Sequence, residues 1–249
     1  NGLGGNTILE LQSDYTSAYA AANETYPLTF NSNACINSSK TLTIRPASGV
    51  ASAIALTSAN STLATVVLDG ASYITFDGRN GGTGTNKFLQ IVNTSSTAAA
   101  AGNAVMMRND ASNNTLTFLD LQASNLNPAS NSGTITAGAV PGVVSILSST
   151  AGASGNDNNT ISDCDIHSAT AVGNILNVGI YAFNNTAVGN TANNDNNTIT
   201  NNNIYDCFHA TTATAGIDIL VGNNNYTVTN NSFYKSAGIA YTYTGAVAH

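Results

Sequence analysis

Four stretches of the chain repeat one pattern of apolar and polar residues and align without gaps. They cover residues 114–122, 159–167, 197–205 and 226–234, and a weaker copy begins at residue 72. Each of the four opens with a Thr-x-Thr or Thr-x-Ser step around an apolar residue, a composition that suits a β-strand. Repetition of this kind is typical of proteins in which each unit packs mainly against its neighbours along a stack.

Within each copy two apolar residues lie five positions apart, as do Ile161 and Ile166. Side chains alternate between faces along a straight strand, so residues five apart would point in opposite directions. Both can face inward only if the chain turns a corner between them. Asn201 and Asn202 occupy that place in the third copy, and asparagine tolerates the left-handed backbone that a tight corner needs. The pattern therefore predicts strand, corner and strand, which is one side of a β-helical coil.

A second register follows from glycines that open short apolar strands, at Gly142, Gly179, Gly216 and Gly238. Their spacings are 37, 37 and 22 residues. The step of 22 suits a minimal three-sided coil, and the longer steps predict the same coil with loops added. These loops are expected at 151–158 and 187–196, before the Asn-Thr strand, and at 170–178 and 210–215, after it. Insertions at matching places emerge on matching faces, which often carry binding.

The N-terminal segment differs from the repeats. Residues 7–22 place apolar side chains mostly at helical spacing, with Ser13 as candidate N-cap and Pro27 as a stop. We expect a short amphipathic helix there that covers the first coil, because an open end of stacked strands exposes unpaired edges. Strands are predicted to follow at 28–30, 41–45, 53–57 and 65–69.

The predicted fold is thus all-β, a right-handed parallel β-helix with a short N-terminal capping helix. Residues 1–249 are expected to form a single domain, with the cap over 1–27 and stacked coils over 28–249. Residues 238–249 are expected to begin another coil, so that the native protein continues beyond residue 249.

Composition narrows the classes of partner. Only 8% of residues are charged, against about 25% in ordinary soluble domains. The surface must therefore bind water mainly through uncharged polar side chains, those of Asn, Thr and Ser. The formal net charge is −7 and the chain has six Lys and Arg residues, too few for a basic patch that follows a phosphate backbone. We therefore expect no nucleic-acid binding. No apolar run approaches the roughly 20 residues that cross a bilayer, so no membrane insertion is expected.

The three cysteines, Cys35, Cys164 and Cys207, are an odd number without metal-ligand spacing. We expect small buried thiols, and one disulfide plus a free thiol stays open as the alternative. The three histidines likewise lack zinc spacing, so no metal site is predicted.

A resemblance to a known family rests on three features. Residues 41–46 read Thr-Leu-Thr-Ile-Arg-Pro, residues 73–79 read Tyr-Ile-Thr-Phe-Asp-Gly-Arg, and Asn-Asn-Thr-Ile repeats lead to Asn-Asn-Ser-Phe-Tyr at 230–234. From Tyr26 onward the chain resembles the parallel β-helix repeat region of large secreted surface proteins of Bacteroidetes-type bacteria. The resemblance implies export to the bacterial cell surface and a role in adhesion. The same fold also carries pectate lyases, polygalacturonases and phage tailspikes, so it does not by itself settle function.

An enzyme of this fold would need specific side chains. Inverting glycoside hydrolases use paired carboxylates about 6.5–9.5 Å apart, and Asp163 and Asp165 are the best candidates. We interpret both instead as corner residues that replace Asn201 and Asn203. A lyase would need calcium held by carboxylates and a nearby basic residue, so calcium is the one cofactor considered.

The sequence therefore favours a non-catalytic stalk or adhesion segment, with a polysaccharide lyase or hydrolase as the alternative. A polysaccharide or cell-surface glycan is the expected partner, together with end-to-end or lateral self-association. Tyr181, Tyr205 and Tyr234 are expected to be exposed and to contact sugar rings. His167 shares the position of Tyr205 and Tyr234 in the repeat, so these three rings are expected to stack, and His167 is predicted to bind the ligand together with the tyrosines.

Three smaller expectations complete the analysis. Asn203 should lie over Asp165 and Asn202 over Cys164, and Asp206 and Lys235 occupy equivalent positions that suit an ion pair. The Thr-x-Thr steps raise ice binding as a second alternative, since threonine ladders on β-solenoids can order water. Ser162 and Tyr73 are expected to interrupt the rows, and the added loops to disturb a flat face.

Overall fold

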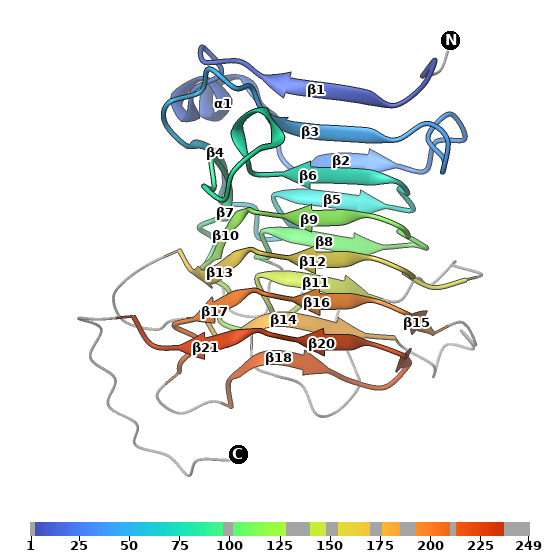
Figure 1. Cartoon of the computed structure of the whole chain (residues 1–249). Coiled ribbons are helices and arrows are strands. Elements are labelled where there is room, and N and C mark those ends of the chain that lie inside the picture. The colour runs from blue at the N-terminus through green and yellow to red at the C-terminus, as the bar shows by residue number, and fades with distance from the viewer. Residues whose placement is uncertain are drawn as a thin grey trace.

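The computed structural model describes residues 3–96, 102–127, 140–147, 154–169, 176–184, 193–209 and 213–236. Most of its secondary structure is β-strand, arranged in three parallel sheets (Figure 1). The first sheet contains β1 (Thr7–Leu11), β3 (Leu42–Pro46), β6 (Ile74–Asp77), β9 (Thr115–Thr117), β12 (Thr160–Ser162), β16 (Thr198–Thr200) and β20 (Thr227–Thr229).

The second sheet contains β4 (Ile54–Ser58), β7 (Leu89–Asn93), β10 (Asp120–Ala123), β13 (Asp165–Ser168), β17 (Asn203–Tyr205) and β21 (Ser232–Tyr234). The third contains β2 (Leu28–Asn31), β5 (Val66–Asp69), β8 (Val105–Arg108), β11 (Val144–Leu147), β14 (Val178–Phe183) and β18 (Ala215–Ile219). The other described elements are α1 (Ser17–Asn23), the 3-10 helix η1 (Asn80–Gly82) and the short parallel pair β15 (Asn194–Asp195) and β19 (Asn223–Asn224).

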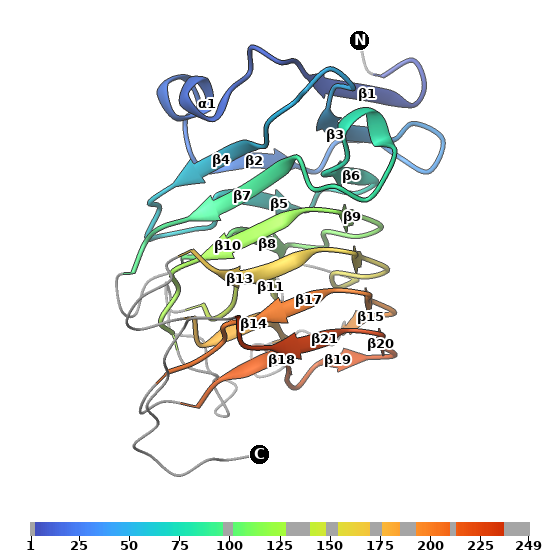
Figure 2. The ribbon, with the colours of Figure 1, turned by 60° about the vertical axis from the view of Figure 1, so that its left-hand side comes forward.

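The chain visits the three sheets in a constant order, so that β6, β7 and β8 make one turn and β9, β10 and β11 the next. Each strand pairs in parallel with the strand of the same sheet one turn later, as Thr160 does with Thr115 on one side and Thr198 on the other. Backbone hydrogen bonds therefore run between turns. The stacked strands fit a repeat, solenoid-like arrangement, and the all-β prediction is confirmed (Figure 2).

The corner predicted inside each repeat is confirmed. Between the first-sheet and second-sheet strands one residue of each copy has a left-handed backbone, with φ of 50°, 56°, 57° and 56° at Phe118, Asp163, Asn201 and Asn230. The flanking apolar residues of the repeat stack in register, as Ile161 does on Leu116 and Ile166 on Leu121. These side chains have at most 1% of their surface exposed, so the interior is a continuous apolar column.

Buried asparagines form ladders at the corners of the coils. The side-chain Oδ1 of Asn159 accepts from the backbone N–H of Asn114 at 3.0 Å and from its Nδ2 at 3.1 Å, and Asn197 accepts in the same way from the Asn159 backbone at 2.8 Å. Nδ2 of Asn159 donates to the Ala111 carbonyl at 2.8 Å. A parallel ladder runs from Asn156 to Asn194. Each amide thus binds backbone groups that the corners leave without strand partners.

The predicted capping helix exists but is shorter than expected. Residues 7–11 form strand β1 rather than helix, and the N-cap is Thr16, whose hydroxyl accepts from the Tyr19 backbone, not Ser13. In the first turn α1 takes the place that a second-sheet strand has in later turns, and it packs on β4 (Figure 2). Ser17 Oγ accepts from the Ala55 N–H at 2.8 Å and donates to the Ala53 carbonyl at 3.5 Å, which satisfies part of this sheet edge.

The other strand predictions are confirmed within a residue or so for β2, β3, β4 and β5. In the glycine register, Gly179 and Gly216 lie side by side as expected. Gly142 is one residue out of step, because Val144 pairs with Ile180 and Gly142 instead forms the turn into β11, with φ of 96°. The strand at Gly238, the coil at 238–249 and most of the added loops lie outside the described residues.

Candidate functional site

The outer side of the second sheet gathers most of the chemistry-bearing side chains predicted from the sequence. Because side chains alternate along a strand, the residues flanking the inward Leu121, Ile166 and Ile204 point outward. They form two rows, which together are called the polar face here. One row contains Gln90, Asp120, Asp165 and Asn203, and the other contains Gln122, His167, Tyr205 and Tyr234.

Three rings of the polar face stack on successive turns, as predicted. The rings of His167 and Tyr205 are 4.5 Å apart with 13° between their planes, and those of Tyr205 and Tyr234 are 4.9 Å apart with 11°. Tyr205, the middle ring, has both of its faces covered by its neighbours in the stack. Tyr234, which is 49% exposed, is the last ring of the row among the described residues, and one of its faces has no ring of the described part against it. Burial, followed by the nearby carboxylates, raises the pKa values of Tyr205 and Tyr234.

His167 is held between two hydrogen-bond acceptors. Its Nε2 lies 2.9 Å from Oδ1 of Asp120 and its Nδ1 lies 2.8 Å from the Ser168 carbonyl. A carbonyl and a carboxylate both accept hydrogen bonds, and only the protonated ring can donate to both, so this geometry favours the imidazolium form. Burial lowers the pKa of His167, but the hydrogen bond and charge of Asp120 with the Ser168 carbonyl outweigh it, and the net shift is upward.

The two outward carboxylates of the polar face are engaged within the fold. Asp120 also accepts from Gln90 Nε2 at 2.8 Å and from Gln122 Nε2 at 3.0 Å. Asp165 lies beside it in register on β13 and accepts from Lys87 at 2.9 Å and from Asn203 at 2.8 Å. The predicted contact between Asn203 and Asp165 is therefore confirmed.

Asp163 and Asp165, the candidate catalytic pair, have different positions in the coil. Asp163 sits at the corner with the same left-handed backbone as Asn201, as the corner interpretation requires. The pKa of Arg79 is raised, chiefly by its hydrogen bond to Asp77, and Asp163 adds to this at the same corner. Next to Asp163, Cys164 donates its backbone N–H to Oδ1 of Asn202 at 3.0 Å, so the other predicted corner contact is also present.

Tyr181 does not belong to the exposed aromatic residues, and the expectation that it contacts a ligand from the surface is wrong. It is fully buried on β14, a strand that is buried at all six positions. It belongs to a second apolar cluster, with Met106, Val178 and Phe183 on strands of the third sheet itself. Strands buried on both faces read as continuous apolar runs, and the sequence 178–183 is one.

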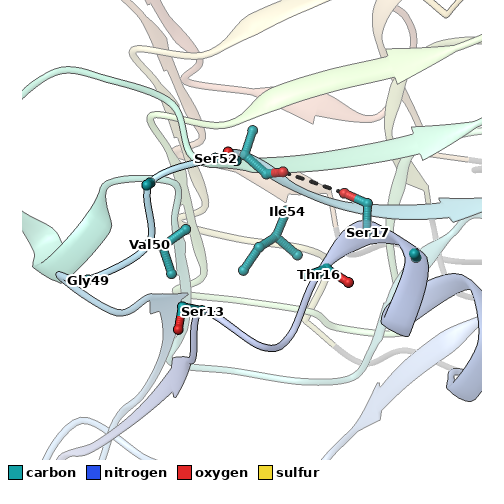
Figure 3. Close-up of a pocket in the computed structure, with 10 residues that line it drawn as sticks. Ser13, Thr16, Ser17, Gly49, Val50, Ser52 and Ile54 are labelled. Carbon is teal, nitrogen blue, oxygen red and sulfur yellow. Dashed lines mark hydrogen bonds between the residues drawn. The ribbon is translucent and has the colours of Figure 1, made fainter.

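Two cavities in the described part of the structure could hold a ligand, one beside α1 and one at the end of the polar face. One of about 410 Å³ lies between α1 and residues 49–54, lined by Ser13, Thr16, Ser17 and Ser52 with Val50 and Ile54 (Figure 3). None of the described residues that line it is ionisable, so it offers hydroxyl contacts but no acid–base group. The other, of about 320 Å³, adjoins the end of the polar face and is lined by Tyr205, Asp206, Phe208, Phe233, Tyr234 and Lys235.

Sequence reasoning missed two parts of this arrangement. Lys87, the partner of Asp165, precedes β7 in a segment without repeat character, so nothing in the sequence indicated it. The buried amides of Asn114, Asn159 and Asn197 were visible as the first residue of three repeats, and that recurrence was the signal.

Within the described ranges, no group of three or more His, Cys, Asp and Glu side chains is arranged to hold a metal ion. No helix in the described part of the chain has the length and apolar character to span a membrane. Comparison with protein-family models, with curated proteins and with solved structures found no match for this chain.

Proposed function

We propose that the chain is a segment of a right-handed parallel β-helix that serves as a rigid, non-catalytic stalk with adhesive capacity on a bacterial cell surface. The handedness follows from a general rule, since crossovers between parallel strands of one sheet are right-handed in about 98% of cases. The constant order of the three sheets makes every turn such a crossover.

The stalk proposal rests on one observation: two sets of hydrogen bonds join successive turns, one between strand backbones and one from buried asparagine side chains. Beside the backbone ladders of three sheets, the buried side chain of Asn159 binds backbone of the preceding turn, and the backbone N–H of Asn159 donates to Oδ1 of Asn197 on the next turn. At the next corner the side chain of Asn202 accepts from the Cys164 N–H and donates to the Ile161 carbonyl of the preceding turn, and the Asn202 N–H donates to Asn231 of the next turn. A turn so fastened cannot tilt against its neighbour without breaking buried hydrogen bonds, which resists bending of the whole stack.

The polar face supports a structural role over a catalytic one. A carboxylate that attacks or protonates a substrate must reach it, but Asp120 accepts from three side chains and Asp165 from two. Adhesion to a cell-surface glycan would use the ring face of Tyr234 that no described ring covers and the adjoining cavity, because aromatic rings offer an apolar surface with a polar rim to a sugar. The resemblance to secreted surface proteins supports the location.

The experiment is an incubation of the purified chain with acidic and neutral polysaccharides, with and without calcium, reading both binding and new chain ends. We expect binding to at least one glycan without new ends, weakened by Tyr234→Ala. The matched control is Tyr19→Ala, since Tyr19 on α1 is also 49% exposed but lies at the other end of the stack. Equal loss in both variants, or no binding to any glycan, would remove the adhesive part of the proposal.

One observation favours a second candidate, a polysaccharide lyase or glycoside hydrolase. Asp120 and Asp165 are register partners on one face, beside the imidazolium of His167 and the ammonium of Lys87. In the same assay, new chain ends that disappear with Asp120→Asn or Asp165→Asn, but persist with Asp163→Asn at the corner, would assign the polar face to catalysis. Loss with Asp163→Asn as well would restore the pair first considered from the sequence.

A further inference from the structure

The outer side of the first sheet carries an unbroken row of threonines. Consecutive strands place them directly side by side, at Thr43, Thr75, Thr115, Thr160, Thr198 and Thr227. Two residues along each of the last four strands a second row follows, at Thr117, Ser162, Thr200 and Thr229. These ten residues are called the threonine face.

Of the interruptions expected from the sequence, that by Tyr73 is absent and that by Ser162 is present, while most of the loops expected to disturb a flat face lie outside the described residues. Tyr73 lies at the corner before β6, with φ of 59°, so Thr75 and not Tyr73 occupies the row. Ser162 replaces a threonine but keeps the hydroxyl, and its Oγ lies 3.0 Å from that of Thr117. Figure 1 shows the strands β9, β12, β16 and β20 stacked one below another with little twist.

The spacing of the threonine face is set by the sheet itself. Neighbouring parallel strands lie about 4.8 Å apart, and residues two apart along a strand about 6.6 Å. The row of six therefore extends for about 24 Å, and with the second row it forms a two-dimensional array. The ion pair of Arg45 with Glu10 and that of Arg79 with Asp77 lie on the first turns, outside the part with two rows.

The two rows differ in how their hydroxyls are used. In the second row hydroxyls bind one another across turns, as Thr200 does with Thr229 at 3.0 Å. None of the six first-row hydroxyls forms a hydrogen bond to another described residue, and these side chains are partly or fully exposed. The first row can thus hold water at regular intervals, while the methyl groups between the hydroxyls leave little freedom for other water positions.

The partner that fits such a surface must repeat in two dimensions, because equal groups on successive turns can be matched together only by a regular lattice. The face has no aromatic ring in its rows, whereas the rings suited to sugars lie on the polar face. It is also uncharged where both rows are present. We infer that the threonine face binds ice, a function separate from the stalk and adhesion roles proposed above.

The test measures thermal hysteresis and partition of the purified chain into a slowly growing ice hemisphere. Thr160→Tyr and Thr198→Lys each place a large group in the middle of the row, and both should abolish hysteresis and partition. Ser232→Tyr is the control, because Ser232 is an exposed outward residue of the second sheet on β21. Circular dichroism and melting of each variant identify any that fails to fold, and two disruptions at different turns keep the comparison usable.

The wild-type chain and Ser232→Tyr are expected to produce faceted ice crystals and to partition into the ice, and the two row variants are expected to do neither. Wild-type protein that stays in the liquid overturns the inference, and so does retained activity in both row variants. Binding to crystalline chitin or cellulose without effect on ice would assign the face to another lattice and also overturn it. The glycan assay stays distinguishable, because it depends on Tyr234 on the second sheet, whereas chitin or cellulose binding by the threonine face would be lost in Thr160→Tyr and Thr198→Lys.

Discussion

Nε2 of His167 lies 2.9 Å from Oδ1 of Asp120 on the preceding turn. Its Nδ1 faces the Ser168 carbonyl, so the contacts favour a protonated His167 ring, which stacks on Tyr205. A ring cation against the face of a tyrosine is attracted by the electron-rich face. The contact therefore joins three turns, from Asp120 on β10 through His167 on β13 to Tyr205 on β17.

The first prediction concerns pH. Because the pKa of His167 is raised on folding, its protonation stabilises the folded chain. This contribution is complete below the ordinary histidine value and is lost as pH rises through the higher folded value. NMR titration of the imidazole should give a pKa above the ordinary one, and urea unfolding should show stability falling across that window. In Asp120→Asn the His167 pKa should drop, and an unchanged titration would show that the carboxylate does not hold the proton.

The second prediction tests the asparagine ladder. Asn159→Ala removes the acceptor for the Asn114 N–H and the donor to the Ala111 carbonyl, both buried. Leaving such groups unpaired costs about 1–3 kcal/mol each, so we expect the free energy of unfolding to fall by at least about 2 kcal/mol. Chemical denaturation measures it. Asn224→Ala on β19, an exposed position, is the control and should change stability little. Similar losses in both variants would indicate that a buried asparagine of the ladder contributes no more to stability than an exposed one.

The third prediction uses the thiols. Burial raises the pKa of Cys164 and of Cys207 to about 12, whereas Cys35 is exposed. The thiolate is the reactive form, so only Cys35 should react with a thiol reagent under native conditions. All three should react in denaturant, because all three cysteines are free. Cys35→Ser should remove the native reaction, and a second fast thiol in that variant would place Cys164 or Cys207 at the surface.

The parts of the fold that could be predicted from the sequence are those in which the same residue pattern recurs from one repeat to the next. Ile161 and Ile166 required a corner, and Asp163 has the left-handed backbone that a corner needs. The stacking of His167, Tyr205 and Tyr234 followed from equal positions in aligned repeats. Cys164 was correctly expected to be buried, but Cys35 lies outside any repeat and is exposed.

What the sequence could not show depends on side chains from non-repeating segments and on what covers a strand. Tyr181 was expected to be exposed, yet it lies in an apolar cluster of the third sheet and is fully buried. The apolar spacing of residues 7–11 fits a strand as well as a helix turn, and pairing with β3 decided for the strand. Short apolar segments leave this ambiguity because neighbours, not propensity, settle it.

The last prediction concerns the glycine that β14 and β18 each have as their second residue. A methyl group on Gly179 would lie 2.5 Å from the Gly216 carbonyl oxygen and 2.7 Å from Cγ2 of Ile204. One contact is with the backbone of the next turn, so it cannot be relieved by turning a side chain. We expect Gly179→Ala to destabilise the chain by roughly 1–3 kcal/mol, as other overpacked cores are destabilised.

Thermal and chemical unfolding of Gly179→Ala would measure this loss. Gly49→Ala is the matched control, because a methyl group there would meet no atom within 4 Å. A melting temperature of Gly179→Ala equal to that of Gly49→Ala would mean that β14 and β18 lie farther apart than their paired register requires. The expected difference would instead show that β14 and β18 can pack at this distance only because position 179 has no side chain.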